Sequence, residues 1–316
     1  MGLFDKNEPV FLKEGSSARE ELAVLESLRT SLPPQAQQQI DDEIRVVKAG
    51  IAGEDRVLFE LKHSHMDMVV LQDLFLEHDD LTAQIDFMVL TRRRYFVIEC
   101  KNLYGNIEVD SRGNFIRHLG GAKRKGIYSP VTQNRRHLEL LHAIRRDNHG
   151  AAFNFFADQT FDDQYRSLVV LANPKTVLDD RFAPKEVKDQ IVRADRLIAT
   201  IEEINRQQGL GHSKLSLSDV REAGEWLLGL NKPNPVDYTA KYQRLAQAAS
   251  SESVSAAQTA SDNVARPAEA RAGDAQVCPI CGSPLVLRTA RRGARAGKEF
   301  YGCSAYPKCH FIRNVD

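Results

Sequence analysis

The sequence predicts an α/β fold followed by a small, separate metal-binding module. Strand-like apolar runs alternate with amphipathic helical patterns along most of the chain, which indicates a sheet covered by helices. Four of the five cysteines fall within the last 39 residues, a distribution typical of a metal site in a reducing compartment. The 316 residues, of which 42% are apolar, are enough for one domain with a full core and one smaller module.

The stretch 84–101, QIDFMVLTRRRYFVIECK, contains two apolar runs separated by three arginines. We expect these runs to form a buried hairpin, with Asp86 at the start of its first strand. Glu99 and Lys101 end the second strand and are two residues apart, so their side chains leave the same face. Burying these charges is costly, and a bound cation with a phosphate substrate is the offset that we expect.

The other elements follow from periodicity and from Pro or Gly breaks. We expect helices over about 17–32 and 35–61, the second interrupted near Gly50 and Gly53, and a helix opened by Pro130. Further strands are predicted at 68–76, 107–109, 115–118 and 166–172, and further helices at 196–206, 216–230 and after 236. The predicted organisation is a helical extension at 1–47, a central domain at 48–175, a helical tail at 176–245, a flexible linker at 246–276 and a cysteine module at 277–316.

Charge is segregated along the chain although the formal net charge is zero. Between Arg112 and Arg146 there are nine Lys or Arg against one acid. Within this region Lys123, Arg124 and Lys125 are predicted to form a mobile basic loop, which is either a solvated turn or a phosphate contact. We find no signal-like or membrane-spanning apolar run, so we expect a cytoplasmic protein without a membrane partner.

The carboxylates and the lysine of the hairpin suit phosphodiester hydrolysis. Hard cations such as Mg²⁺ or Mn²⁺ prefer oxygen ligands, and Asp86 and Glu99 would supply two of them. Lys101 could orient the attacking water and stabilise the developing charge. The alternative is that these residues are ordinary solvated strand ends. Cys100, between Glu99 and Lys101, is predicted to be a small buried hydrophobe on the opposite face.

Four segments give this weak motif a context: GIAGEDRV from Gly50, QIDFMVL, YFVIECKNLYGNI, and SPVTQN from Ser129. In this order and spacing they resemble the nuclease-related domain (NERD) family over about 48–175. That family is assigned to the restriction-endonuclease-like PD-(D/E)XK superfamily, which implies a mixed sheet flanked by helices. The resemblance implies a catalytic set of Glu54, Asp86, Glu99, Lys101 and Gln133.

For two members of this set a structural role remains open. Glu54 could be a charge favoured by the helix dipole, and Gln133 an ordinary polar residue in the first turn of its helix. His137 and His142 are five residues apart, which does not place them on one helix face, so we interpret them as surface or satisfied residues.

The cysteine module has the spacing of a structural zinc site. Cys278 and Cys281 are separated by two residues, Cys303 and Cys309 by five, and the 21 residues between the pairs could form an antiparallel ribbon. Four thiolates close a tetrahedral Zn²⁺ site with no open position. Free thiols are the alternative, but so few large apolar residues would hardly fold without metal.

The segment CPICGSPLVLRTARRGARAGKEFYGCSAYPKC resembles the C4 zinc finger at the carboxyl terminus of bacterial type I topoisomerases. Fingers of that kind bind DNA, often single-stranded. The basic residues and a candidate stacking ring agree with this function: Arg288, Arg291, Arg292, Arg295, Lys298 and Tyr306.

We therefore expect a Mg²⁺-dependent DNA nuclease, for DNA repair or processing, whose zinc ribbon holds the substrate. A second hypothesis is a non-catalytic DNA-binding or recruitment protein that uses a nuclease-like scaffold. A third is a regulatory module that binds a protein partner through its amino-terminal helices.

Overall fold

The computed structural model of the chain describes residues 7–147, 160–207, 214–249, 277–289, 299–305 and 309–314. The chain divides into two compact units. The first joins Met1–Leu22 to Arg45–Val236, and the second joins Ala23–Ile44 to Asp237–Asp316. Within the described residues, no helix is both long enough and apolar enough to cross a bilayer.

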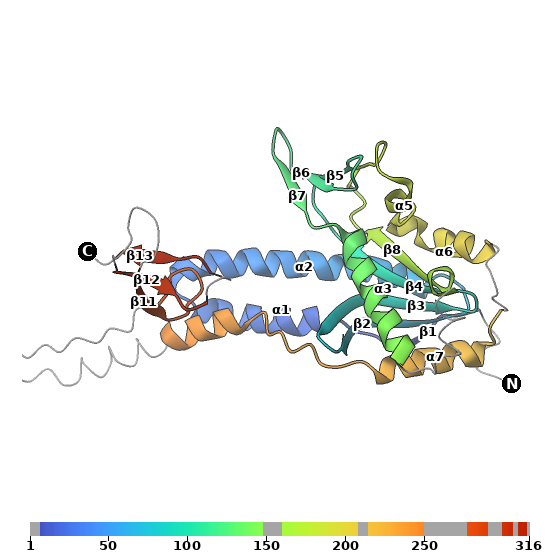
Figure 1. Cartoon of the computed structure of the whole chain (residues 1–316), viewed down its shortest axis with the longest axis horizontal. Helices are drawn as coiled ribbons and strands as arrows, with labels where there is room; N and C mark the ends of the chain where they lie inside the picture. Colours follow the sequence, from blue (N-terminus) through green and yellow to red (C-terminus); the bar gives the residue numbers. More distant parts are fainter. Residues whose placement is uncertain are drawn as a thin grey trace, which may run out of the picture. The chain divides into compact units, whose positions relative to one another are not determined.

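The first unit is built on a six-stranded mixed sheet with the order β1-β2-β3-β4-β8-β10 (Figure 1). The two central pairings, β2 with β3 and β3 with β4, are antiparallel, and the other three are parallel. This mixed sheet with flanking helices matches the predicted fold class. The strands are β1 (Val10–Lys13), β2 (Met68–His78), β3 (Leu81–Thr91), β4 (Tyr95–Lys101), β8 (Tyr165–Leu171) and β10 (Ile191–Arg193).

Helices cover both faces of the sheet. On one face α3 (Pro130–Asp147) and α7 (Leu217–Gly229) add Leu140, Ile144 and Val220 to a buried cluster with side chains of β2, β3 and β4. On the other face α2 (Pro34–Lys62) and α6 (Leu197–Arg206) pack apolar side chains such as Val57 and Ile201 against the opposite side chains of the same strands. Strands buried on both faces explain why β3 and β4 appear as nearly continuous apolar runs.

A second, four-stranded sheet has the order β7-β6-β5-β9 and its own small core. Its strands are β5 (Asn106–Val109), β6 (Phe115–His118), β7 (Arg124–Ile127) and β9 (Leu178–Asp179). The prediction of β5 and β6 is confirmed. The prediction of a basic loop is wrong for Arg124 and Lys125, because both residues pair with β6 as part of β7. Lys123 lies in the turn before this strand.

Three elements differ from the expectation. Helix α2 runs without interruption through Gly50 and Gly53, because a glycine weakens a helix without ending it. The strands β1 and β10, in segments predicted to be helical, add an edge strand at each side of the sheet. Their four and three residues are too short to show a period. The remaining short elements of this unit are α5 (Lys185–Lys188) and the 3₁₀ turn Ala194–Arg196.

The second unit contains helical segments and the cysteine module. Helix α1 (Ser17–Leu28), the 3₁₀ turn Arg29–Ser31 and α2 contribute residues 23–44, and a further helix spans 240–249. Tyr242 is buried, and its hydroxyl donates to the carbonyl of Gln39 at 3.0 Å. The module contains β11 (Leu285–Thr289), β12 (Glu299–Cys303) and β13 (Ile312–Asn314), in that order in an antiparallel sheet. The predicted ribbon of the first two strands is confirmed, and β13 extends it.

Candidate functional site

Glu99 and Lys101 leave the end of β4 on the side covered by α3. Glu99 is 2% exposed, and its Oε1 accepts a charged hydrogen bond from Lys101 Nζ. Glu99 Oε2 is buried, and it has no hydrogen-bond partner in the described part of the chain. Burial raises the pKa of Glu99. Burial alone would lower the pKa of Lys101, but the neighbouring Glu99 carboxylate outweighs this effect and raises the pKa of Lys101. One carboxylate oxygen is thus held by a cation and the other is left open.

Gln133 approaches the same lysine from α3. Lys101 Nζ donates to Gln133 Oε1 at 3.2 Å. The next residue, Asn134, is fully buried and donates to the carbonyl oxygens of Val97 and Leu168 at 3.1 and 3.0 Å, which fixes the first turns of α3 on β4 and β8. The predicted first-turn glutamine therefore lies against the lysine of the hairpin and does not point to bulk water.

The regular alternation of side chains in β2 and β3 breaks beside this point. In each strand, two residues three positions apart belong to the same core cluster: Leu71 with Leu74, and Ile85 with Met88. Asp73, which has a φ of 57°, and Asp86 lie at these breaks. Such irregularities redirect side chains next to functional sites. Asp86 Oδ2 accepts the backbone N–H of Cys100 at 2.7 Å.

The sequence predicted Asp86 at the start of its strand, but Asp86 lies in the middle of β3. The pairing of β3 with β4 ends at Phe87 and Ile98. Asp86 and Glu99 are the next residues on the two strands, so Asp86 approaches Glu99. Burial, followed by repulsion from Glu99, raises the pKa of Asp86 to about 8. Two carboxyl groups in this environment resist being ionised together.

Glu54 reaches the site from α2, on the other side of the sheet. Its Oε2 accepts a hydrogen bond from Gln72 Nε2 at 3.3 Å. Burial, followed by the charge of Asp86, raises the pKa of Glu54 to about 7. The approach of α2 depends on Gly53, because a Cβ atom there would lie 2.6 Å from Asn102 Cβ. Among the described residues, the carboxylates of Glu54, Asp86 and Glu99 do not all lie within 4.8 Å of one another.

The segment that contains β1 supports this arrangement. Lys13 Nζ donates to the carbonyl oxygens of Gln72 and Asp73 at 2.8 and 2.6 Å, and Gly15 N–H donates to Gln72 Oε1 at 3.1 Å. Ser17 N–H donates to Asp73 Oδ2 at 2.7 Å. Gln72 is 3% exposed, so its amide is fixed between this segment and Glu54.

His137 lies one turn after Gln133 on α3 and is buried. Its Nδ1 has no hydrogen-bond partner in the described residues. Burial, followed by the charge of Lys101, lowers the pKa of His137 to about 4, so the ring is neutral near pH 7. The interpretation of His137 as a surface or satisfied residue is therefore wrong. Its spacing of four from Gln133 was the signal that placed both on one face.

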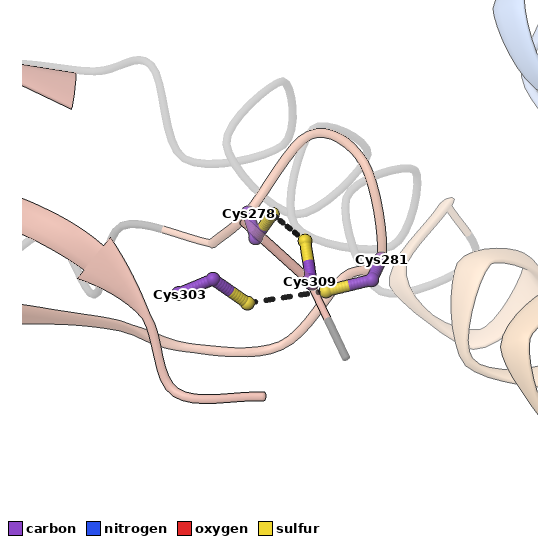
Figure 2. A group of neighbouring side chains, drawn as sticks. All are labelled: Cys278, Cys281, Cys303 and Cys309. Carbon is purple, nitrogen blue, oxygen red and sulfur yellow. Dashed lines mark hydrogen bonds between the residues drawn. The ribbon is translucent and has the colours of Figure 1, made fainter. Parts of the chain in front are cut away.

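The four cysteines of the module converge from two turns (Figure 2). Their Sγ atoms all lie within 4.8 Å of one another, with 3.6 Å between Cys278 and Cys309 and 3.2 Å between Cys281 and Cys303. Four thiolates around one Zn²⁺ at about 2.3 Å would be about 3.8 Å apart, so the set fits zinc. The turn after Cys281 uses Gly282 at a φ of 67°, where a side chain would be strained.

Residues 49–172 match the family model of the nuclease-related domain. Residues 275–316 match that of the topoisomerase DNA binding C4 zinc finger. The chain thus carries a nuclease-related domain and, after it, a C4 zinc ribbon. Searches of curated proteins and of solved structures found no match to the chain.

The nuclease-related domain contains all five residues expected to form its site. The structure gathers Asp86, Glu99, Lys101 and Gln133 around the end of β4, and Glu54 approaches from α2. Sequence reasoning missed Gln72 and Asp73, although these two adjacent polar residues inside the apolar run MVVLQDLFL were a signal that the alternation breaks there. The donor set is rich in carboxylate oxygens, and one of them, Glu99 Oε2, is buried and unpaired. These residues therefore suit a hard divalent cation, which would balance the excess of acid.

The expected nucleic-acid contacts are only partly described. Lys123, Arg124 and Lys125 are exposed at one edge of the small sheet, and Arg288 is exposed on β11 of the zinc ribbon. The other residues predicted for DNA binding lie outside the described residues: Arg291, Arg292, Arg295, Lys298 and Tyr306. Cys100 packs beside the core cluster under α2, on the face opposite Glu99 and Lys101 as expected, but it is partly and not fully buried.

Proposed function

We propose that the protein is a divalent-metal-dependent DNA nuclease that hydrolyses phosphodiester bonds and binds DNA through its zinc ribbon. The observation that carries this proposal is Glu99, which is buried with one oxygen on Lys101 and the other unpaired beside Asp86. Structural ion pairs rarely leave such an atom unsatisfied. The match of residues 49–172 to the nuclease-related domain supports the same conclusion.

In this proposal Asp86 and Glu99 hold Mg²⁺ or Mn²⁺, which when bound lowers the pKa of water and neutralises phosphate charge. Lys101 is positioned by Glu99 and Gln133 so that its ammonium orients the attacking water and stabilises charge on the phosphate. Gln133 keeps the lysine in place or reaches the phosphate. Glu54 adds an acidic group at the edge of the site, oriented by Gln72.

The test is cleavage of linear, nicked and single-stranded DNA by the full chain with Mg²⁺ or Mn²⁺. We expect Asp86→Ala and Lys101→Ala to lower the cleavage rate by about 10²-fold or more, since each removes charge stabilisation in the transition state. Lys232→Ala, which removes an exposed lysine paired with Glu77 at 3.1 Å, should leave the rate unchanged. Undiminished cleavage by the first two variants would refute the assignment.

Metal binding can be tested apart from cleavage through its pH dependence. The folded-state pKa values of Glu54 and Asp86, about 7 and about 8, lie above the ordinary 4.5 and 3.8. The folded protein therefore keeps protons that the unfolded chain releases, and the contribution of these groups to stability falls as pH rises from about 4 to 8. Because a cation favours the ionised forms, millimolar Mg²⁺ should raise the melting temperature more at pH 8 than at pH 5.5. In Asp86→Asn this difference should shrink, and an equal shift at both pH values would contradict the cation site.

A non-catalytic DNA-binding protein is the second candidate, favoured by the match of the ribbon to a DNA binding finger. It requires salt-sensitive DNA binding that survives Asp86→Ala, together with no metal-dependent cleavage by the wild-type chain.

A further inference from the structure

Exposed tyrosines and basic residues lie in and around the small sheet. We define the aromatic basic patch as Tyr104, Arg117, Lys125, Tyr128 and Arg136. The tyrosine side chains are 72% and 56% exposed. Neither ring belongs to the core of the sheet, which consists of Ile107, Val109 and Phe115 with partly buried neighbours.

Contacts link the members of the patch in two groups, Tyr104 with Arg117 and Lys125, and Tyr128 with Arg136. Arg117 Nε donates to the carbonyl oxygen of Tyr104, and Arg117 lies directly opposite Lys125 in the pairing of β6 with β7. The Arg136 guanidinium lies 5.5 Å from the centre of the Tyr128 ring. Leu103 and Ile127, the residues just before the two tyrosines, pack against the same small core. Each tyrosine therefore directly follows a residue of the same small core.

The patch has more positive charge than the fold itself requires. Arg117 and Lys125 lie directly opposite each other on β6 and β7. Like charges in such positions destabilise a sheet. Lys125 makes no ion pair with any residue that the structure describes. The acids in the strands of this sheet have other partners: Glu108 contacts Arg124 at 2.9 Å and His118 at 2.8 Å, and Asp179 contacts Arg181 at 2.8 Å. A bound polyanion such as a phosphate backbone would offset the repulsion.

The patch is within reach of the groups that would act on a phosphodiester. Tyr104 follows Lys101 by three residues, so their Cα atoms are at most about 10 Å apart. Tyr128 precedes Gln133 by five residues, three of them in the first turn of α3, which limits that span to about 12 Å. Lys101 and Gln133 contact each other at 3.2 Å, so the backbone of each tyrosine lies within about 12 Å of the backbone of one residue of this pair.

From this juxtaposition we infer that the patch binds an unpaired DNA strand, stacking its bases on Tyr104 and Tyr128 and placing its backbone at Lys101. The inference rests on the proposed nuclease function and narrows its substrate class to single-stranded or frayed DNA. Exposed rings stack on free base faces, which duplex DNA already covers with neighbouring base pairs. A duplex needs only the basic groups.

Two measurements with the full-length chain test this inference. A single-stranded oligonucleotide containing 5-iodouracil, irradiated with the protein in the absence of divalent metal, should cross-link to Tyr104 and Tyr128, as mapped by mass spectrometry. With Mg²⁺ or Mn²⁺, Tyr104→Ala and Tyr128→Ala should each lower kcat/KM on single-stranded DNA by about tenfold and leave cleavage of a blunt duplex unchanged. The Tyr→Phe variants keep the ring and should retain activity.

Tyr238→Ala is the matched control, because this tyrosine is 53% exposed and outside the patch. Cross-links that fall only in the zinc ribbon, or a blunt duplex cleaved faster than single strands with no effect of the tyrosine variants, would overturn the inference. If the wild-type chain cleaves no DNA, the proposed function fails, and the cross-links with single-strand affinities of the same variants still decide whether the patch binds unpaired bases.

Discussion

We expect removal of zinc to unfold the ribbon of the full chain and to leave the nuclease-related domain folded. The buried core of the described ribbon consists of Cys278, Cys303 and Cys309, with partly buried neighbours such as Leu285 and Phe311. A core in which the metal ligands are the buried members has little apolar area with which to offset chain entropy. Zinc binding to such sites contributes on the order of 10 kcal/mol to folding.

Hydrogen exchange measured by mass spectrometry checks this expectation. After chelation, the amides of β11 and β12 should lose protection, while those of β3 and β4 keep theirs. Cys309→Ser should give the same pattern without chelator. Cys100→Ser is the matched control, because this cysteine lies in the nuclease-related domain and is not in the cluster, so zinc content should not change. Ribbon amides that stay protected in verified zinc-free protein would show that the fold does not depend on the metal.

Arg94→Met should lower the free energy of unfolding of the nuclease-related domain by about 3 to 5 kcal/mol. Arg94 is 2% exposed. Its guanidinium donates to Asp163 Oδ1 at 3.0 Å and to the carbonyl oxygens of Asp163, Ile204 and Gln207 at 3.1, 2.6 and 3.2 Å. Methionine keeps the volume but removes the buried cation, so the carbonyl oxygens lose these donors and the Asp163 carboxylate keeps Arg166 but loses Arg94 as an arginine partner. The last two carbonyls lie at the end of α6, where a positive charge also favours the helix dipole.

The turn that contains Arg94 provides its own control. Arg93 is adjacent and exposed, so Arg93→Met should change the free energy of unfolding by no more than about 0.5 kcal/mol. Urea denaturation of both variants gives the comparison. Equal unfolding midpoints for Arg93→Met and Arg94→Met would mean that the buried hydrogen bonds contribute nothing net.

The hairpin was predictable because its residues carry strong local signals. Two apolar runs with a charged turn between them fix β3 and β4, and the spacing of Glu99 and Lys101 fixes their common face. The three-arginine turn gave no sign that Arg94 is buried and Arg93 exposed, because nothing in the local sequence distinguishes the two residues. That difference arises from Asp163 and α6, which are distant in the sequence.

The parts of the site that were missed depend on pairing between distant segments. The strand β1 pairs with β2, which is far away in the sequence. Gln72 donates to Glu54, and its own side chain is held by the backbone N–H of Gly15, also from a distant segment. His137 gave a helical spacing signal but no sign of burial, because burial there depends on how α3 packs on the sheet. The strand pattern of the hairpin and the resemblance to the nuclease-related domain thus located the expected residues of the site, and long-range packing determined which neighbours hold them.

The parallel pairing of β1 with β2 sets an order in time for assembly. During synthesis, residues 10–13 leave the ribosome well before the strand 68–78 that they pair with, and residues 165–171, which pair with β4, follow much later. The lysine of the site meets its glutamine only when α3 can settle on β4 and β8, as the Asn134 hydrogen bonds require. A nascent chain arrested before residue 171 would therefore lack an assembled site, which would delay any cleavage until translation of this domain is complete.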